Sequence, residues 1–224
     1  TTSAPSAFFI HSKYADAYES KSILQEKDLD DLGSGRPFVP DVGGSSLATV
    51  VFTSGSTGAK KGVMISHHNL IANTTSIVQY LQLTENDRIL VVLPFNYCYG
   101  ASLLHTHLRA GGSITLFDAN FLGAVPDYVD RYMCTGFAGV PSTYQILLAK
   151  SNFTRREMPS LRYMTQAGGK LENRFIQQII DAFPNKRFFV MYGATEATAR
   201  MSYLPPHLLG KKLGSIGKGI PGVK

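Results

Sequence analysis

The amino-acid sequence predicts an α/β fold in which a mainly parallel sheet is covered by helices on both faces. Short apolar runs of strand length recur from Leu47 onward. Stretches with helical spacing lie between most of these runs, and this alternation is typical of parallel sheets with crossover helices. Ligands of such sheets bind beside the carboxyl ends of the strands, so the loops after the strands are the first candidates for a site.

Each element follows from this pattern in chain order. The strand-like runs are residues 48–53, 88–93, 113–117, 135–139, 161–165 and 187–192. The helical stretches are residues 67–82, 101–110, 123–132, 141–150 and 171–182. Ser66 stands directly before the first helix and is a suitable N-cap. The longest apolar runs suit buried strands, because none approaches the ~18 residues of a membrane helix.

The organisation of the chain changes near residue 46. Residues 1–46 are predicted to be an irregular or linker segment from an incomplete preceding subdomain, because a charge-mixed stretch leads into the Gly/Ser sequence DVGGSS. Residues 47–224 are predicted to form one α/β core. The first residues carry no basic region ahead of their apolar patch, so we expect no signal peptide.

Composition and charge narrow the function classes. With 44% hydrophobic residues, 13 Phe and 11 Tyr, the chain is globular in composition and not disordered. The formal charge is +6, but no basic stripe is interleaved with aromatic residues, so we expect no nucleic-acid partner. A small anion such as a nucleotide remains open. Cys98 and Cys134 form no CxxC pair, which favours a reducing, cytoplasmic compartment.

A loop rich in glycine, hydroxyl groups and lysine follows the first predicted strand. Its glycines allow close approach of backbone N–H groups to an anion, and its hydroxyls and lysines add donors and charge. The alternative is a flexible turn between two strands. The loop has no Walker A spacing, which disfavours a P-loop kinase or ATPase. Its residues are Thr53, Ser54, Gly55, Ser56, Thr57, Gly58, Ala59, Lys60, Lys61 and Gly62.

Two later loops offer further ligand contacts. Tyr192 at a strand end can stack on a planar base, Thr195 offers a hydroxyl, and Glu196 offers oxygen ligands for magnesium. In the alternative interpretation, Thr195 only caps a short helix. Gly168 and Gly169 are predicted to form a tight turn from strand to helix.

The histidines do not form a predicted metal site. His105 and His107 are two apart on a predicted helix and point to different sides, and His67 and His68 are adjacent at a helix start. Neither pair has zinc-ligand spacing, so structural or solvent-facing roles are favoured. Cys98 and Cys134 are interpreted as small hydrophobic residues and not as nucleophiles.

The loop sequence FTSGSTGAKKG resembles the signature loop of the adenylate-forming (AMP-binding) enzyme superfamily. It departs from the usual pattern once, because Lys60 stands where proline is common. Other similar motifs follow in the family order, over roughly residues 40–224, and the similarity is greatest to acyl-CoA ligase-like members. These motifs are LPFNYCYG (93–100), AGVPSTY (138–144), QAGGKL (166–171), MYGATE (191–196) and GSIGKGIPGVK (214–224).

The resemblance implies part of the large N-terminal domain of an enzyme that activates a carboxylic acid with ATP and magnesium. An acyl-adenylate would form first, and coenzyme A would then take the acyl group. By resemblance Lys61, Thr195 and Glu196 are catalytic, with Glu196 as the magnesium ligand. The loop from Thr53 holds phosphates. The implied adenine-binding residues are Gly168, Gly169, Tyr192 and Gly193, and the implied substrate pocket is Tyr97, Cys98, Tyr99, Gly100 and Val140.

The resemblance leaves the substrate and the role of this stretch open. Amino-acid-activating members commonly carry an aspartate at the position of Cys98, and residues 93–110 contain no carboxylate. We therefore expect a simple carboxylic acid. The alternatives are an amino acid destined for a carrier-protein thiol, a non-catalytic nucleotide-binding module, and an interaction fragment. The resemblance also implies a C-terminal lid domain beyond Lys224, so residues 1–224 alone are expected to be inactive.

Overall fold

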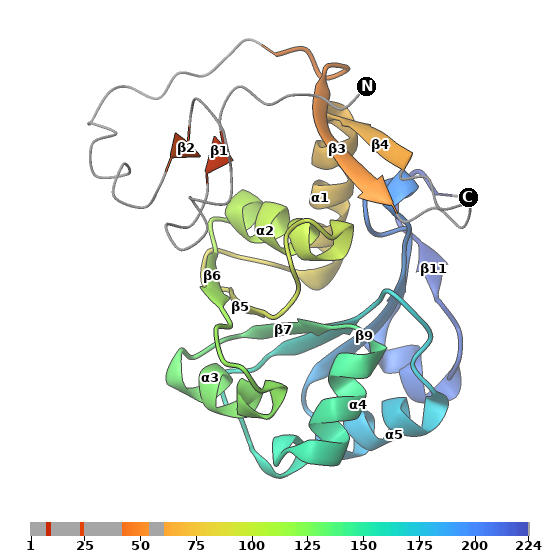
Figure 1. Ribbon diagram of the computed structural model, residues 1–224. Helices are drawn as coiled ribbons and strands as arrows, with labels where there is room; N and C mark the ends of the chain where they lie inside the picture. The colour runs from red at the N-terminus through yellow and green to blue at the C-terminus, as the bar shows by residue number, and fades with distance from the viewer. Residues whose placement is uncertain (1–7, 10–22, 25–41, 54–60, 224) are drawn as a thin grey trace. The chain divides into compact units, whose positions relative to one another are not determined.

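The computed structural model describes residues 8–9, 23–24, 42–53 and 61–223, and the chain divides into two units, Thr1–Val42 and Gly43–Lys224. In the first unit β1 (Phe8–Phe9) pairs in parallel with β2 (Ile23–Leu24), within the stretch predicted to be irregular. The second unit carries the α/β core and is shown with helices and strands labelled in Figure 1. No helix of the described residues is long and apolar enough to cross a membrane.

The core of the second unit is a seven-stranded sheet in the order β11-β10-β9-β8-β7-β5-β6. The strands from β6 to β9 are parallel, and β10 and β11 extend the sheet antiparallel at one edge. The predicted fold class, an α/β structure with a mainly parallel sheet, is confirmed. The strands are β5 (Arg88–Val91), β6 (Ser113–Leu116), β7 (Gly136–Gly139), β8 (Tyr163–Gln166), β9 (Arg187–Tyr192), β10 (Ser202–Leu204) and β11 (Lys218–Gly219).

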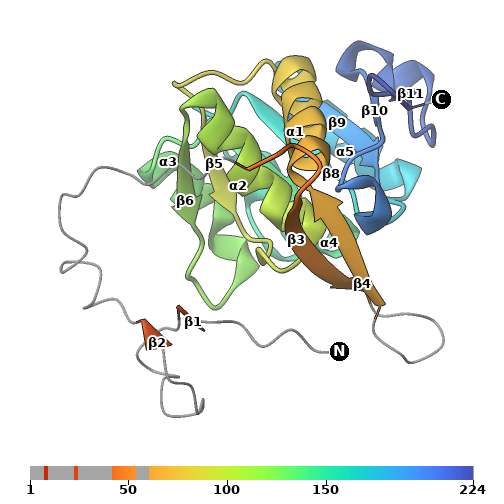
Figure 2. The same cartoon turned by 90° about the horizontal axis from the view of Figure 1, so that it is seen from above.

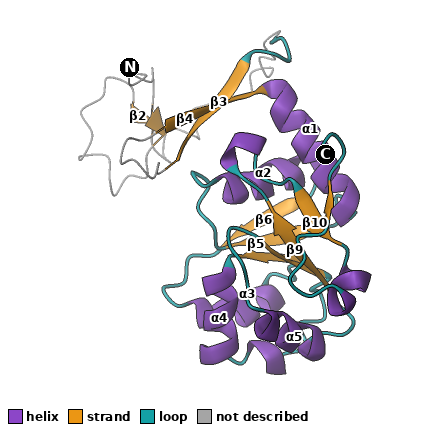
Figure 3. Ribbon diagram, turned by 90° about the vertical axis from the view of Figure 1, so that its right-hand side faces the viewer, coloured by secondary structure: helices purple, strands orange, loops and turns teal. Residues whose placement is uncertain are grey.

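Helices cover both faces of the sheet, as Figures 1 and 3 show. On one face α1 and α2 lie side by side, which is also visible from above in Figure 2. The other face carries α3, α4 and α5. The helices are α1 (His67–Leu81), α2 (Cys98–Ala110), α3 (Val125–Arg131), α4 (Pro141–Lys150) and α5 (Asn173–Ala182).

Each face of the sheet has its own hydrophobic core. Alternate residues of β9 show this, because Phe189 and Met191 pack with α1 and α2, whereas Phe188 and Val190 pack with α4 and α5. A strand that is buried on both faces reads as a continuous apolar run, as RFFVM does. This double burial is why the central strands were recognisable in the sequence.

The first predicted core strand does not belong to the main sheet, and this part of the prediction is wrong. Strand β3 (Leu47–Thr53) pairs antiparallel with β4 (Lys61–Ser66), with Thr53 opposite Lys61. The connection is too short to hold the crossover that a parallel pair needs, so the two strands form a hairpin. The alternative interpretation, a turn between two strands, therefore describes the connectivity. The loop residues 54–60 lie outside the described part of the chain.

The two helices on the first face begin differently, since only α1 has a side-chain N-cap. Ser66 is the N-cap of α1, as predicted, and its Oγ accepts a 3.2 Å hydrogen bond from the backbone N–H of Asn69. The Asn69 side chain accepts in return from the backbone N–H of Ser66 at 3.0 Å. Helix α2 begins at Cys98, three residues earlier than the helical pattern predicts, so Cys98, Tyr99 and Gly100 form its first turn.

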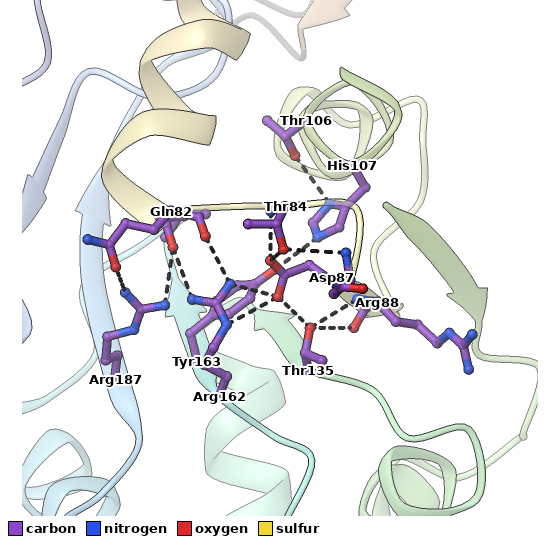
Figure 4. A network of polar contacts seen from close by, with 12 residues as sticks. Gln82, Thr84, Asp87, Arg88, Thr106, His107, Thr135, Arg162, Tyr163 and Arg187 are labelled. Carbon is purple, nitrogen blue, oxygen red and sulfur yellow. Dashed lines mark hydrogen bonds and ion pairs between the residues drawn. The ribbon is translucent and has the colours of Figure 1, made fainter. Parts of the chain in front are cut away.

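A polar network joins the amino ends of the parallel strands, opposite the edge where ligands are expected (Figure 4). Asp87 is 3% exposed and forms a 2.7 Å ion pair with Arg162. The Thr135 hydroxyl donates a 2.7 Å hydrogen bond to the same Asp87 carboxylate oxygen, Oδ1. Arg162 and Arg187 also donate to the backbone oxygen of Leu81 at the end of α1. The network therefore ties α1 to β5, β8 and β9.

Candidate functional site

The loops at the carboxyl ends of β5, β8 and β9 enclose a cavity of about 530 Å³. Predicted site residues from three separate motifs meet in its wall, which is the arrangement expected at this edge of a parallel sheet. They are Tyr97, Cys98, Gly168, Gly169, Tyr192, Gly193 and Thr195. Gln166, Lys170, Leu171, Ile176, Val190, Met191, Ala194, Gly214, Ser215 and Ile216 complete the wall. We call this cavity the strand-end cavity.

The turn after β8 requires glycine for two reasons. Gly168 has φ +83°, a left-handed conformation that side chains disfavour. A Cβ at this position would also lie 2.5 Å from the Tyr97 hydroxyl oxygen and 3.1 Å from Val140. Gly169 follows, and its backbone oxygen accepts a 2.7 Å hydrogen bond from Gln166 Nε2. The predicted tight turn therefore exposes the backbone of Gly168 and Gly169 directly to the cavity, because neither residue has a side chain.

In the loop after β9, the backbone of Gly193 lies close to the backbone of Ala199. A Cβ at Gly193 would lie only 1.6 Å from the Ala199 oxygen, so glycine is required here by the fold. The 3-10 turn Thr195–Ala197 begins after Ala194, which is its N-cap, so the interpretation of Thr195 as a helix cap is wrong. Thr195 Oγ1 instead donates to Cys98 Sγ at 3.4 Å. Tyr192 is 47% exposed, which leaves its ring accessible at the strand end.

Glu196 is exposed at the surface of the turn and is not part of the cavity wall. It follows Thr195, which lines the cavity, in the same 3-10 turn. Protein sites for magnesium in nucleotide enzymes use one or two carboxylates together with the phosphates of the ligand. A single exposed carboxylate of this kind fits that donor set. Among the described residues no cluster of three or more His, Cys, Asp or Glu side chains could hold a metal.

The predicted phosphate loop is described only at its two ends. Thr53 ends β3, and its hydroxyl lies 3.5 Å from the Lys61 backbone oxygen at the start of β4. Lys61 is exposed. Strand β4 is in contact with the 3-10 turn of Thr195 and Glu196, so the hairpin and this turn are neighbours. Ser54, Gly55, Ser56, Thr57 and Gly58 lie outside the described residues.

The predicted substrate-pocket residues divide into two groups. Tyr97 and Cys98 line the strand-end cavity, and Val140 lies beside Gly168. Tyr99 is 3% exposed, and its hydroxyl is 2.7 Å from Thr165 Oγ1 in the core below α2. Burial raises the pKa of Tyr99. Gly100 is buried against the Pro94 oxygen. Because α2 begins at Cys98, Tyr99 and Gly100 turn inward and stand outside the described cavity wall.

A second cavity of about 700 Å³ lies between β3 and the helices α1 and α2. Its wall includes polar side chains such as Asn73, Ser102 and His105. Cys98 lines both cavities. The thiol therefore stands at the boundary between them, beside Thr195.

The sequence interpretation missed several wall residues. Gln166, Lys170, Ser215 and Ile216 lie within the motifs QAGGKL and GSIGKGIPGVK, but the sequence predicts no role for their side chains. Gln166 lies two residues before Gly168, and this position is the available sequence signal. Ser215 and Ile216 come from the segment between β10 and β11, which sequence periodicity did not resolve as part of the sheet.

Comparison with known proteins assigns the family. The family model described as AMP-binding enzyme matches residues 7–224. The chain belongs to the AMP-binding enzyme family. A feruloyl-CoA synthase from Amycolatopsis sp is 31% identical over 85% of this AMP-binding chain and 38% of its own length. A D-alanine–D-alanyl carrier protein ligase from Listeria monocytogenes is 29% identical over 80% of the chain and 37% of its own length. The chain thus spans less than half the length of these curated relatives.

Solved structures have the same fold as the AMP-binding chain. The N-terminal domain of FACL13 from Mycobacterium tuberculosis superposes with a TM-score of 0.81 at 18% identity, over 95% of the chain and 56% of that domain. The o-succinylbenzoate coenzyme A synthetase MenE from Bacillus subtilis, in complex with ATP and magnesium, gives a TM-score of 0.77 at 25% identity. The superposition covers 95% of this chain and 45% of the MenE chain.

Proposed function

We propose that this chain is the nucleotide-binding part of an enzyme that activates a carboxylic acid with ATP and forms an acyl-adenylate. The observation that carries the proposal is the gathering of the Gly168 turn, the Tyr192 strand end and Thr195 around one cavity at the carboxyl edge of the sheet. The family supports this proposal, as does the likeness to a synthetase that was crystallised with ATP and magnesium.

Each part of the nucleotide has a candidate partner. The Tyr192 ring and the backbone of Gly168 and Gly169 would frame the base. The Thr195 hydroxyl would donate to the α-phosphate. The loop that ends at Lys61 would hold the β- and γ-phosphates through backbone N–H groups, hydroxyls and lysine charge. Magnesium bound beside Glu196 would supply positive charge to the phosphates.

The residues of the chain would act by positioning and by charge stabilisation. A carboxylate oxygen of the acid forms a bond to the α-phosphorus, and the bond from phosphorus to the pyrophosphate oxygen breaks. The two reacting anions repel each other, so the site must place them in line and spread their charge. Lys61 would neutralise the leaving pyrophosphate, while Thr195 would hold the α-phosphate. Cys98, which accepts from Thr195, would border the acyl group at the cavity edge.

The proposed substrate is a simple carboxylic acid, and the proposed acceptor is coenzyme A in the cytoplasm. No Asp or Glu occurs in residues 93–110, and none of the described residues that line the two cavities is acidic. An α-ammonium group in such a pocket would be left without a charged partner. The feruloyl-CoA synthase supports the same acceptor. The similarity to the D-alanyl carrier protein ligase supports a second candidate, in which the substrate is an amino acid and the acceptor is a carrier-protein thiol.

ATP–pyrophosphate exchange in the full-length protein tests the proposal. A panel of aliphatic and aryl acids should support exchange, whereas D-alanine and other amino acids should not. Glu196→Gln should reduce the exchange rate, and Glu85→Gln, an exposed carboxylate at the opposite edge of the sheet, should not. Binding of magnesium-ATP without exchange for any acid would instead indicate a non-catalytic nucleotide-binding module.

A further inference from the structure

Gln166, in the wall of the strand-end cavity, has a buried oxygen without a hydrogen-bond partner among the described residues. The residue is 0% exposed. Its Nε2 donates to the Gly169 oxygen at 2.7 Å, and this contact fixes the amide orientation because two oxygens would repel at that distance. Oε1 is therefore an acceptor, and it has no hydrogen-bond donor among the described residues. A buried acceptor without a donor is rare in folded proteins and requires an explanation.

The surroundings of Gln166 show what kind of group would meet this oxygen. Val190 is its direct neighbour on β9 and is 9% exposed. Leu171 and Ile176 are almost fully buried and line the same cavity. These three side chains offer no donor. The acceptor thus lies beside the apolar side chain of Val190, next to the Gly168 and Gly169 turn.

We propose that Gln166 Oε1 accepts a hydrogen bond from the exocyclic amino group of adenine and so selects ATP over other purine nucleotides. This inference rests on the proposed function, in which the adjacent glycine turn and Tyr192 frame the base. Adenine carries an amino donor at its six position, whereas guanine and hypoxanthine carry an acceptor oxygen there. An ionised simple acid offers only acceptors, so the donor comes from the nucleotide.

The proposal predicts a specific pattern of discrimination. A purine nucleotide with an acceptor at the six position would place two oxygens together. A purine without a six substituent would leave Oε1 buried and without a partner. Loss of one such contact costs about tenfold or more in affinity. The effect concerns the base alone, so the triphosphate contacts stay the same in every nucleotide compared.

The test measures dissociation constants of ATP, GTP and purine riboside triphosphate, each with magnesium, by calorimetry on the full-length protein. We expect wild type to bind purine riboside triphosphate about tenfold more weakly than ATP. In Gln166→Met, ATP should lose about tenfold, so that the ratio between the two nucleotides falls toward one. Gln166→Glu in its neutral form keeps both a donor for Gly169 and an acceptor, and should restore part of the ratio.

A matched control separates base recognition from loss of structure. Thr165→Val removes a buried polar group from the same strand, where Thr165 Oγ1 contacts the Tyr99 hydroxyl on the opposite face of the sheet. It should lower the melting temperature but leave the ratio of ATP to purine riboside triphosphate unchanged.

The outcomes distinguish this inference from the proposed function. A wild-type protein that binds none of the three nucleotides overturns the proposed function. A protein that binds ATP and purine riboside triphosphate equally well overturns the role of Gln166 alone. The role of Gln166 is also overturned when Gln166→Met leaves this ratio unchanged but alters the preference between hydroxylated and plain acids, because the donor then belongs to the acid.

Discussion

The side-chain amide of Asn73 donates a 2.7 Å hydrogen bond to the backbone oxygen of Arg200. Asn73 lies on α1, and Arg200 directly follows the loop that carries Thr195 and Glu196. Thr198 and Ala199, the last residues of that loop, have positive φ angles of 62° and 100°. Such conformations are strained for residues other than glycine and persist only when the surroundings hold them. The bond to Asn73 is one of the contacts that hold this loop in place.

Asn73→Ala should lower the free energy of unfolding by about 1–3 kcal/mol, because the buried oxygen of Arg200 loses its donor. The change should also loosen the loop of Thr195. Hydrogen exchange provides the readout, since the amide of Ala199 donates to Ala194 inside the loop. Faster exchange confined to this loop is expected. Uniformly faster exchange throughout the core would contradict a local role.

Arg200→Met should change stability by less than about 1 kcal/mol or increase it, because burying a charge without an ion-pair partner is costly. Arg200 is 1% exposed, its Nε is unpartnered, and no salt bridge to it exists among the described residues. Arg200 donates to the hydroxyls of Tyr80 and Ser102. Both hydroxyls keep another bond without it, since Ser102 donates to the Tyr99 backbone oxygen and Tyr80 donates to Met191 Sδ. Urea unfolding measures the change. A loss above about 2 kcal/mol would mean that a partner compensates the charge.

Arg162→Met should behave in the opposite way. Asp87 is buried and depends on Arg162 for its ion pair, so the substitution leaves a buried carboxylate. We expect a loss of about 3 kcal/mol, measured by the same urea titration. Asp87→Asn combined with Arg162→Met should recover part of the loss, because the remaining charge is then removed. Equal effects of the two arginine substitutions would contradict this account.

The sequence was informative where burial or parallel topology imposes a pattern. The sequence predicts that the loops at Gly168 and Tyr192 lie close together, because parallel strands place their carboxyl ends at one edge of the sheet. The apolar run of β3 predicts a buried strand, but Leu47, Val50 and Phe52 are exposed in the hairpin. An apolar run also does not show which strand it pairs with. The first turn of α2 was missed because Tyr97 and Cys98 gave no capping signal.

Other features depend on contacts between residues distant in sequence. The unpartnered oxygen of Gln166 becomes visible only once its neighbours on β9 and the glycine turn are in place. Arg200 is similar, because nothing in YGATEATAR indicates that its last residue is buried. Both residues are notable because a buried atom, Oε1 of Gln166 or Nε of Arg200, has no hydrogen-bond partner among the described residues.

His107 should make the protein less stable in mild acid. Burial lowers the pKa of His107 to about 4, although the hydrogen bond with the Leu103 oxygen acts in the opposite direction. Its Nδ1 donates to that oxygen, so Nε2 accepts from the Tyr163 hydroxyl at 2.9 Å. The folded state thus holds neutral imidazole, whereas the unfolded state has a pKa of about 6.5.

Between pH 6.5 and 4 the unfolded state therefore binds more protons than the folded state, and stability falls as pH falls. The His107 contribution to stability is fully present above pH 6.5, and about 3 kcal/mol of it is lost by pH 4. Urea titrations from pH 7.5 to 4 measure this slope, and His107→Gln should remove most of it. Burial would raise the pKa of Asp87, but hydrogen bonds from Arg162, Thr135 and Thr84 lower it, so this group acts only at still lower pH. An unchanged slope in His107→Gln would contradict the assignment.

Gly168→Ala should weaken nucleotide binding as well as folding. The alanine would have to adopt a φ of +83°, and its Cβ would meet the Tyr97 hydroxyl at 2.5 Å. A cost of about 1–3 kcal/mol in stability is expected for the backbone strain. The variant Tyr97→Phe/Gly168→Ala removes the contacted oxygen and should regain part of the ATP affinity, measured by calorimetry. No recovery in the double variant would show that φ alone is responsible.

Lys61→Ala should weaken the binding of magnesium-ATP by about 1–3 kcal/mol, the range for a charge-assisted contact to phosphate. Lys61 is exposed at the start of β4, beside the turn of Thr195, and the hairpin register places it opposite Thr53. Lys60 adjoins it in sequence, so Lys60→Ala/Lys61→Ala should cost more than either change alone. AMP lacks the β- and γ-phosphates and should bind the variants as it binds wild type. Lys150→Ala, an equal change of charge at the far end of α4, is the control and should leave both affinities unchanged. Equal losses for AMP and ATP would show that Lys61 contacts another part of the ligand.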